Sequence, residues 1–285
     1  MKVFILGVAA LAFLFLCREG SARLLEPDCG TTRTSNRVKR VVGGHDAEMF
    51  ANPWMVLLLK DLNFTCGGTL ITSRFVLTAA NCIHLQINKV RLGEYDRSTN
   101  PDCSSMVCKG SSFEIDIERL IPHPSYAKPW SVPNDIGLVQ MAQNVIFSDH
   151  IRPICLLVDQ FVVRTFTSFD VTGWGKTNTS ETSLKLQTAT LTHFNRSKCQ
   201  SMFEKPINEY QICAGSDTSD TCKGDAGGPL SAQLVYGEIQ RVFQFGITSF
   251  GLTSCLGVGI YTNVTHYINW IENSIKENLY PFVTY

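Results

Sequence analysis

The sequence predicts an all-β fold, with strands closed into barrels or packed as sandwiches, and one α-helix at the carboxyl end. From residue 52 onward, short apolar or β-branched runs are broken by turn-forming residues about every ten residues, which is typical of barrels and sandwiches rather than βαβ units. Only the end of the chain shows a helical period. The 285 residues are 44% apolar and 18% charged, which supplies a large core and excludes a disordered chain.

The strands are expected where apolar and β-branched residues gather between turn signals. In chain order, examples of such runs are Trp54–Leu59, Thr69–Ala80, Lys89–Leu92, Ile136–Val139, Phe169–Trp174, Val242–Phe250 and Gly259–Val264. We find no internal repeats and no low-complexity tracts.

The helix is expected near the carboxyl end, where apolar residues recur at intervals of three and four and therefore share one face. These residues are Val264, Tyr267, Ile268, Ile271 and Ile275. Asn263 directly precedes them, and its side chain suits a helix N-cap.

Residues 1–22 have the features of a secretory signal peptide. Lys2 supplies a positive charge, and the apolar run Val3–Cys17 is too short to span a bilayer comfortably, which argues against the alternative of a membrane anchor. Gly20 and Ala22 are small residues at the −3 and −1 positions of a cleavage site. We therefore expect a secreted, extracellular protein that does not associate with a membrane.

The chain has eleven cysteines, of which ten remain once the signal peptide carries Cys17 away. An even number in a secreted chain predicts disulfides, and the spacings offer no CxxC pair and no zinc-type cluster. The sequence alone leaves the pairing open, although Cys103 and Cys108 are near enough to close a small local loop.

Positive and negative side chains balance, with 25 Lys plus Arg and 25 Asp plus Glu. No basic field is left for nucleic acid or an anionic membrane. We expect no nucleic-acid partner, no cofactor and no metal.

A basic run, Arg37-Val38-Lys39-Arg40, stands where the composition changes from polar to apolar. Such a run is usually a solvated patch, but its place at this change favours a processing site. The chain is expected to divide into residues 1–22 as signal peptide, 23–40 as propeptide or light chain, and 41–285 as the folded domain.

Five motifs occur in a fixed order over about residues 41–275. They are Val41-Val42-Gly43-Gly44, Thr78-Ala79-Ala80-Asn81-Cys82, Asn134-Asp135-Ile136-Gly137-Leu138, Cys222-Lys223-Gly224-Asp225-Ala226-Gly227-Gly228-Pro229 and Ser249-Phe250-Gly251. In them the chain closely resembles the chymotrypsin family of trypsin-like serine proteases. The resemblance implies two packed six-stranded β-barrels with the active site in the cleft between them.

Hydrolysis by that family needs a hydroxyl nucleophile, an imidazole base and a carboxylate that orients the imidazole. By resemblance Asp135 is the carboxylate, but Asn81 stands in place of the histidine and Ala226 in place of the serine. A neutral amide accepts no proton near pH 7, and a methyl group cannot attack a carbonyl. His84 is a conceivable substitute base, but it would have no hydroxyl at position 226 to activate.

Parts of the machinery that need no triad are retained. The resemblance implies an oxyanion hole from the backbone N–H groups of Gly224 and Ala226, and a trypsin-like pocket with Asp220 at its base. The pocket walls would be Ser249, Gly251 and Gly259, with Phe250 where the family usually has tryptophan.

An activation device is also implied. Cleavage between Arg40 and Val41 by a protease of trypsin-like preference would free the amine of Val41. That amine would then pair with Asp225, which precedes Ala226.

The family's disulfide pairing implies five bridges and a tethered light chain. They are Cys66–Cys82, Cys199–Cys213, Cys222–Cys255, Cys29–Cys155 and Cys103–Cys108. The last pair is similar to one in some arthropod clip-domain proteases. The clip module itself needs six upstream cysteines where only Cys29 is present, so we expect no clip domain.

Two kinds of accessory site remain. Glycosylation sequons stand at Asn63, Asn178, Asn195 and Asn263, the last being the weakest because a helix start would compete with it. A family calcium loop would begin near Glu94, but Ser111 replaces its second acidic ligand.

The sequence therefore favours a secreted noncatalytic protease homologue that binds proteins as a cofactor or regulator in an extracellular protease cascade. One alternative is an active trypsin-like serine endopeptidase that cleaves after Arg or Lys. Another is a structural or adhesive protein that uses only the stable scaffold.

Overall fold

The computed structural model describes most of the chain. The described residues are 23–33, 44–104, 107–126, 133–158, 166–175, 182–216, 225–251 and 257–279. The expected signal peptide, the Arg40–Val41 cleavage site, Asp220, Gly224 and Asn178 lie outside these residues.

The first barrel is a closed sheet of six antiparallel strands in the order β3-β4-β5-β8-β7-β6. Its strands are β3 (Met55–Lys60), β4 (Asn63–Leu70), β5 (Phe75–Thr78), β6 (Lys89–Leu92), β7 (Phe113–Pro122) and β8 (Gly137–Met141). Leu57 and Leu58 of β3 are both fully buried, although successive side chains point to opposite faces of a strand. The strand is therefore covered on both faces.

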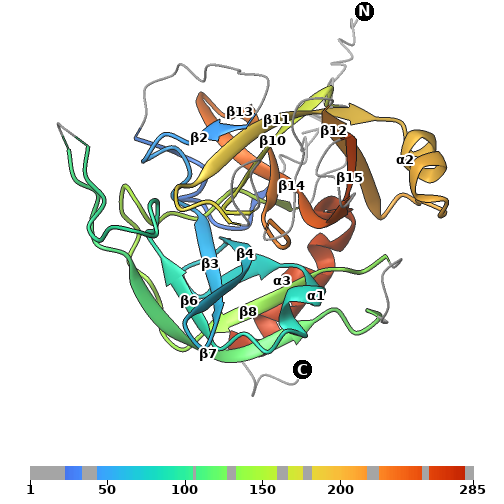
Figure 1. Cartoon of the computed structure of the whole chain (residues 1–285). Helices are drawn as coiled ribbons and strands as arrows, with labels where there is room; N and C mark the ends of the chain where they lie inside the picture. Colours follow the sequence, from blue (N-terminus) through green and yellow to red (C-terminus); the bar gives the residue numbers. More distant parts are fainter. Residues whose placement is uncertain are drawn as a thin grey trace, which may run out of the picture.

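The second barrel has the order β10-β13-β14-β15-β12-β11 and closes through pairing of β10 with β11. Its strands are β10 (Ser168–Gly173), β11 (Gln187–Phe194), β12 (Gln211–Ser216), β13 (Pro229–Tyr236), β14 (Ile239–Gly251) and β15 (Gly257–Asn263). The short strand β2 (His45–Asp46) adds to β11. The two barrels lie one above the other in Figure 1, and the predicted architecture is confirmed.

Helices cover only small parts of this architecture. They are α1 (Ala80–Ile83), α2 (Arg196–Phe203), the 3₁₀ helix η1 (Val264–Tyr267) and α3 (Ile268–Leu279). The expected apolar face of η1 and α3 is present, and Val264, Ile271 and Ile275 join the core that the first barrel forms. The chain thus leaves the second barrel at β15 and packs its last helix back onto the first, as Figure 1 shows.

Two local predictions were wrong. The expected strand Thr69–Ala80 is two strands, because the Thr72 hydroxyl accepts the backbone N–H groups of Arg74 and Phe75 and turns the chain. Asn263 does occupy the N-cap position of η1, but its side chain makes no capping hydrogen bond: its Nδ2 donates instead to the carbonyl of Glu209 at 3.0 Å.

The segment 23–33 is packed onto the domain. Strand β1 (Arg23–Leu24) pairs with β9 (Leu157–Val158), and Arg241 Nη1 donates to the carbonyls of Pro27 and Cys29 at 2.9 and 2.6 Å. Cys29 is itself fully buried. These contacts join the segment to residues that follow Val41 in the chain. A cut between Arg40 and Val41 would therefore leave them in place.

The described residues contain disulfides that match the implied pairing. They are Cys29–Cys155, Cys66–Cys82, Cys103–Cys108 and Cys199–Cys213. The fifth implied pair, Cys222–Cys255, lies outside the described residues.

Candidate functional site

Asp135 lies just before β8 and is buried at the junction of the two barrels. Its Oδ1 accepts the backbone N–H of Asn81 at 2.8 Å, and its Oδ2 accepts the hydroxyl of Ser249. Burial raises the pKa of Asp135, and the hydrogen bonds from Ser249 and Asn81 oppose that rise. The carboxylate is therefore held by neutral donors from both barrels.

Asn81 is positioned by the short helix α1. The disulfide from Cys82 to Cys66 ties this helix to β4, and the backbone N–H of Asn81 points at Asp135. The position that the resemblance gives to an imidazole thus carries a neutral amide beside the buried carboxylate.

Ala226 lies three residues before the start of β13, in a turn of the second barrel that meets β4. Its carbonyl accepts the N–H of Gly67 at 2.9 Å and lies 3.5 Å from the sulfur of Cys82. The structure therefore brings Ala226 next to the helix that carries Asn81.

Gly227 makes this close approach possible. Its φ is +83°, and an added Cβ would lie 2.1 Å from Thr78 Oγ1 and 2.3 Å from the carbonyl of Gly67. Only glycine avoids both the strained backbone angle and these contacts.

His84, the conceivable substitute base, is the residue at the C-terminus of α1. Its exposed ring stacks on Tyr126 with the ring centroids 5.4 Å apart. Burial, with a smaller contribution from Asp135, raises the pKa of Tyr126 to about 12. His84 is thus near the carboxylate, but residue 226 offers it no hydroxyl.

Asp225, the implied partner of a new amino terminus, lies against the end of β10. Its Oδ1 accepts the N–H of Gly175 at 2.9 Å. A Cβ at Gly173 or Gly175 would come within 2.1 or 2.4 Å of the carboxylate, so a larger residue at either position would displace the Asp225 side chain. Sequence reasoning missed this cradle, although two glycines around one tryptophan at a strand end were a signal for it.

The implied pocket walls lie on two paired strands. Gly251 on β14 is opposite Gly259 on β15. Ser249, assigned to the wall from the sequence, also donates to Asp135, a role that the sequence did not reveal. Phe250 contacts Phe203 of α2 edge-to-face, with the ring centroids 5.4 Å apart.

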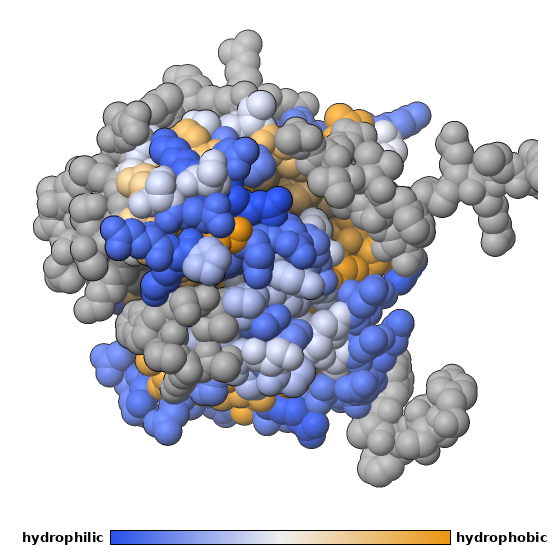
Figure 2. All heavy atoms as spheres, turned by 90° about the vertical axis from the view of Figure 1, so that its right-hand side faces the viewer, coloured by the Kyte–Doolittle hydropathy of each residue, from blue (hydrophilic) through white to orange (hydrophobic). Residues whose placement is uncertain are grey.

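Three further properties bear on function. Among the described residues no three His, Cys, Asp or Glu side chains gather to hold a metal ion, and no described helix is long and apolar enough to cross a membrane. Figure 2 shows one face of the molecule, on which the described residues are mostly hydrophilic and the hydrophobic ones form small separate areas.

The two closed barrels, the buried Asp135 at their junction and the turn at Ala226 define the trypsin class of fold. The family model for trypsin matches residues 41–271. The chain belongs to the trypsin family.

Its relatives include named insect proteases. The chain is 36% identical over 269 residues to the Spaetzle-processing enzyme of Drosophila melanogaster. This alignment covers 83% of the present chain and 66% of that protein. It is 34% identical over 293 residues to phenoloxidase-activating factor 3 of Holotrichia diomphalia, covering 92% and 82% of the two chains.

A solved structure has the same fold. The crystal structure of the Drosophila Grass clip serine protease of the Toll pathway aligns with a TM-score of 0.75 at 33% identity. The alignment covers 88% of this chain and 75% of that one.

Proposed function

We propose that this protein is a noncatalytic member of the trypsin family that acts by binding. The observation that carries the proposal is the identity of two residues, Asn81 and Ala226, at the junction where Asp135 is held. Losing the nucleophile or base of such a triad costs about 10⁶-fold in rate, and binding with the oxyanion hole retains roughly 10³–10⁴ over water. The rate that remains is too low for the protein to act as an enzyme.

The parts that do not depend on a base or nucleophile support a binding role. Ser249 still holds Asp135, and Gly173 and Gly175 still accommodate Asp225. We propose that the trypsin-like pocket over Asp220 and the oxyanion hole of Gly224 and Ala226 remain formed and accept an arginine or lysine side chain.

We propose further that the protein is secreted and works in an extracellular protease cascade. Relatives bear the names Spaetzle-processing enzyme, melanization protease 1 and phenoloxidase-activating factor 3. Its partners would be proteins of such a cascade, namely a substrate, an inhibitor or a protease. A trypsin-like protease would cut after Arg40, and the amine of Val41 would turn toward Asp225.

Glycans are proposed at exposed sequons. The side chains of Asn63 and Asn195 are exposed at the start of β4 and at the N-cap of α2, and Asn178 is proposed with them. Asn263 is only half-exposed, and its amide is held between Glu209 and Thr265, so it is the least suited of the three described sequons.

Three measurements on the natural chain, cut after Arg40, test this proposal. An arginine amide substrate should show no turnover, and calorimetric titration with benzamidine should show saturable binding. A fluorophosphonate probe should leave the chain unlabelled, with trypsin as the positive control. Turnover or labelling would establish the alternative of an active endopeptidase. Absence of benzamidine binding would show that the pocket does not accept an arginine-like group.

A further inference from the structure

The loop between β6 and β7 buries charged side chains far from the junction described above. Glu94, Asp102 and Lys109 are only 3%, 4% and 4% exposed. This is the loop in which the resemblance implies a calcium site beginning at Glu94. Because burying a charge is costly unless it is paired or hydrogen-bonded, each of these groups needs an identified partner.

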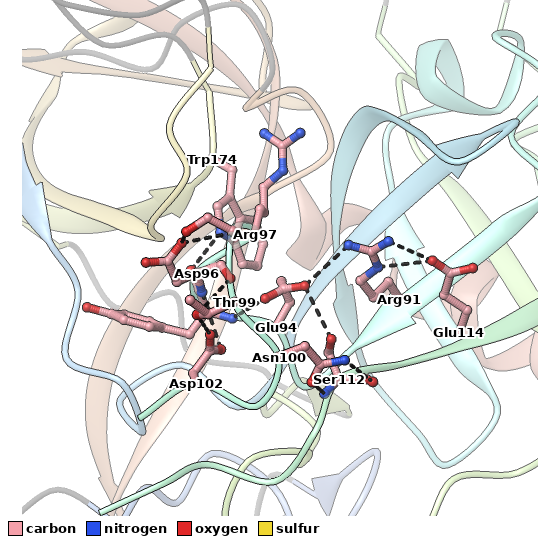
Figure 3. A network of polar contacts seen from close by, with 12 residues as sticks. Arg91, Glu94, Asp96, Arg97, Thr99, Asn100, Asp102, Ser112, Glu114 and Trp174 are labelled. Atoms are coloured by element: carbon pink, nitrogen blue, oxygen red, sulfur yellow. Dashed lines mark hydrogen bonds and ion pairs between the residues drawn. The ribbon is translucent and has the colours of Figure 1, made fainter. Parts of the chain in front are cut away.

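The carboxylate of Glu94 is occupied by protein donors. Its Oε1 accepts the N–H of Tyr95 at 3.0 Å, while its Oε2 accepts the hydroxyl of Ser112 and the guanidinium of Arg91, both at 3.3 Å. Arg91 also binds Glu114 at 2.7 Å. Figure 3 shows Arg91 between the two glutamates, with Ser112 bonded to the same oxygen of Glu94 that Arg91 contacts.

The carboxylate of Asp102 is occupied in the same way. Its Oδ1 accepts the hydroxyl of Thr99 at 2.7 Å, and its Oδ2 accepts the N–H of Asp96 at 3.3 Å. A calcium ion needs six to eight oxygen ligands that converge on one point. In this loop the oxygens of Glu94 and Asp102 are instead directed at N–H and O–H groups, so the described residues do not fit calcium.

Lys109 supplies the positive charge that a metal would have brought. Its Nζ donates to the backbone carbonyl of Glu94 at 3.0 Å, and its own N–H donates to the carbonyl of Asp102 at 2.7 Å. Lys109 thus contacts both acidic residues, Glu94 through its side chain and Asp102 through its backbone. Burial lowers the pKa of Lys109 to about 8, against the attraction of Asp102 and Glu94, so the group is mostly charged at pH 7.

The surroundings leave little space beside this lysine. A Cβ added to Gly110 would lie 2.5 Å from the ring of His150, so the ring packs directly on the backbone next to Lys109. Burial lowers the pKa of His150, and the nearby charge of Lys109 lowers it further. The disulfide Cys103–Cys108 closes the loop from its outer side.

We propose that the ammonium group of Lys109 replaces a divalent cation in the loop of residues 94–112, so that this loop keeps its folded shape without calcium. The loop lines a surface pocket of about 520 Å³ with Arg97, Ser98, Thr99 and Asn100. A built-in cation would keep that surface the same at any calcium concentration. This inference does not depend on the proposed loss of catalysis.

The test compares the natural chain with Lys109→Met, which keeps the apolar stem and removes the ammonium group. Lys205→Met is the control, because Lys205 is exposed. Each protein is measured in 5 mM calcium chloride and in EGTA, by thermal unfolding and by amide hydrogen exchange of residues 94–112.

We expect the melting temperature of the natural chain to be the same in calcium and EGTA. In EGTA we expect exchange in the loop to be at least tenfold faster in Lys109→Met than in the natural chain, while Lys205→Met matches the natural chain. A calcium-dependent rise of several degrees in the natural chain would overturn the proposal. Unchanged loop exchange in Lys109→Met would also overturn it, since the ammonium would then not be what closes the loop.

Discussion

Two regions of the first barrel bury carboxylates and hold them in different ways. At the junction, Asp135 receives hydrogen bonds from Asn81 and Ser249, which are neutral. In the loop of residues 94–112, Glu94 and Asp102 share a region with the buried ammonium of Lys109. Hydrogen bonds from neutral donors stabilise a carboxylate but leave its charge unbalanced, whereas an internal cation balances it. The junction thus depends on neutral donors for its buried carboxylate, whereas the loop buries a cation with its carboxylates.

The largest change in stability is expected at Gly227, whose backbone conformation allows the close approach at the junction of the barrels. Gly227→Ala should lower the free energy of unfolding by about 4 kcal/mol, because it combines a left-handed backbone with contacts to Thr78 and Gly67. Urea denaturation measures the change.

Gly237→Ala is the matched control for that substitution. Gly237 also has a positive φ, +63°, but an added Cβ would meet nothing within 4 Å. Gly237→Ala should lower the free energy of unfolding by only about 1–2 kcal/mol. Equal losses in the two variants would show that the contacts at Gly227 do not constrain the junction.

The charge in the loop can be tested through pH. The folded-state pKa of Lys109, about 8, lies below its ordinary value of 10.5. Between these values the unfolded chain binds more protons than the folded chain, so Lys109 makes stability rise with pH from about 8 to 10.5, by about 3 kcal/mol at most.

Lys109→Met should remove this rise. The measurement is the free energy of unfolding of both proteins at several pH values between 7 and 10.5, and the difference between them isolates Lys109 from other titrating groups. A difference that stays constant over this range would contradict the assignment of a buried, charged Lys109.

The smallest effect is expected for the hydrogen bond from Ser249. Ser249→Ala should cost about 2 kcal/mol at neutral pH, because it removes a donor from a buried carboxylate. The hydrogen bond lowers the pKa of Asp135, so its contribution is present while Asp135 is ionised and is lost as falling pH protonates that group. Ser201→Ala, at an exposed serine, should change stability by less than about 0.5 kcal/mol at any pH. A loss for Ser249→Ala that did not shrink in acid would contradict this reading.

Strands and the last helix could be predicted from the sequence because their patterns are local, whereas the arrangement in two six-stranded barrels came from the family resemblance. The run Lys89–Leu92 is β6 without change of boundary, and the apolar face from Val264 to Ile275 is buried as the spacing requires. The split in Thr69–Ala80 was missed because Thr72 turns the chain between two apolar segments, which periodicity does not detect.

The details of the site depended on contacts between distant parts of the chain. Ser249 reaches Asp135 from 114 positions away, and Lys109 reaches Glu94 only because the loop folds back on itself. The resemblance placed Ser249 in a pocket wall and said nothing of Lys109. Neither contact has a local signature, since each depends on the three-dimensional path of the backbone.

The central claim, an intact scaffold that lacks only a base and a nucleophile, is tested most directly by one amidase measurement. The natural chain and the double variant Asn81→His/Ala226→Ser are both cut after Arg40 and assayed side by side on an arginine amide substrate. We expect no turnover by the natural chain and turnover by the double variant. Because the single gains are not additive, neither substitution alone should restore activity. Turnover by the natural chain would contradict the loss of catalysis. No turnover by the correctly folded double variant would contradict the intact scaffold.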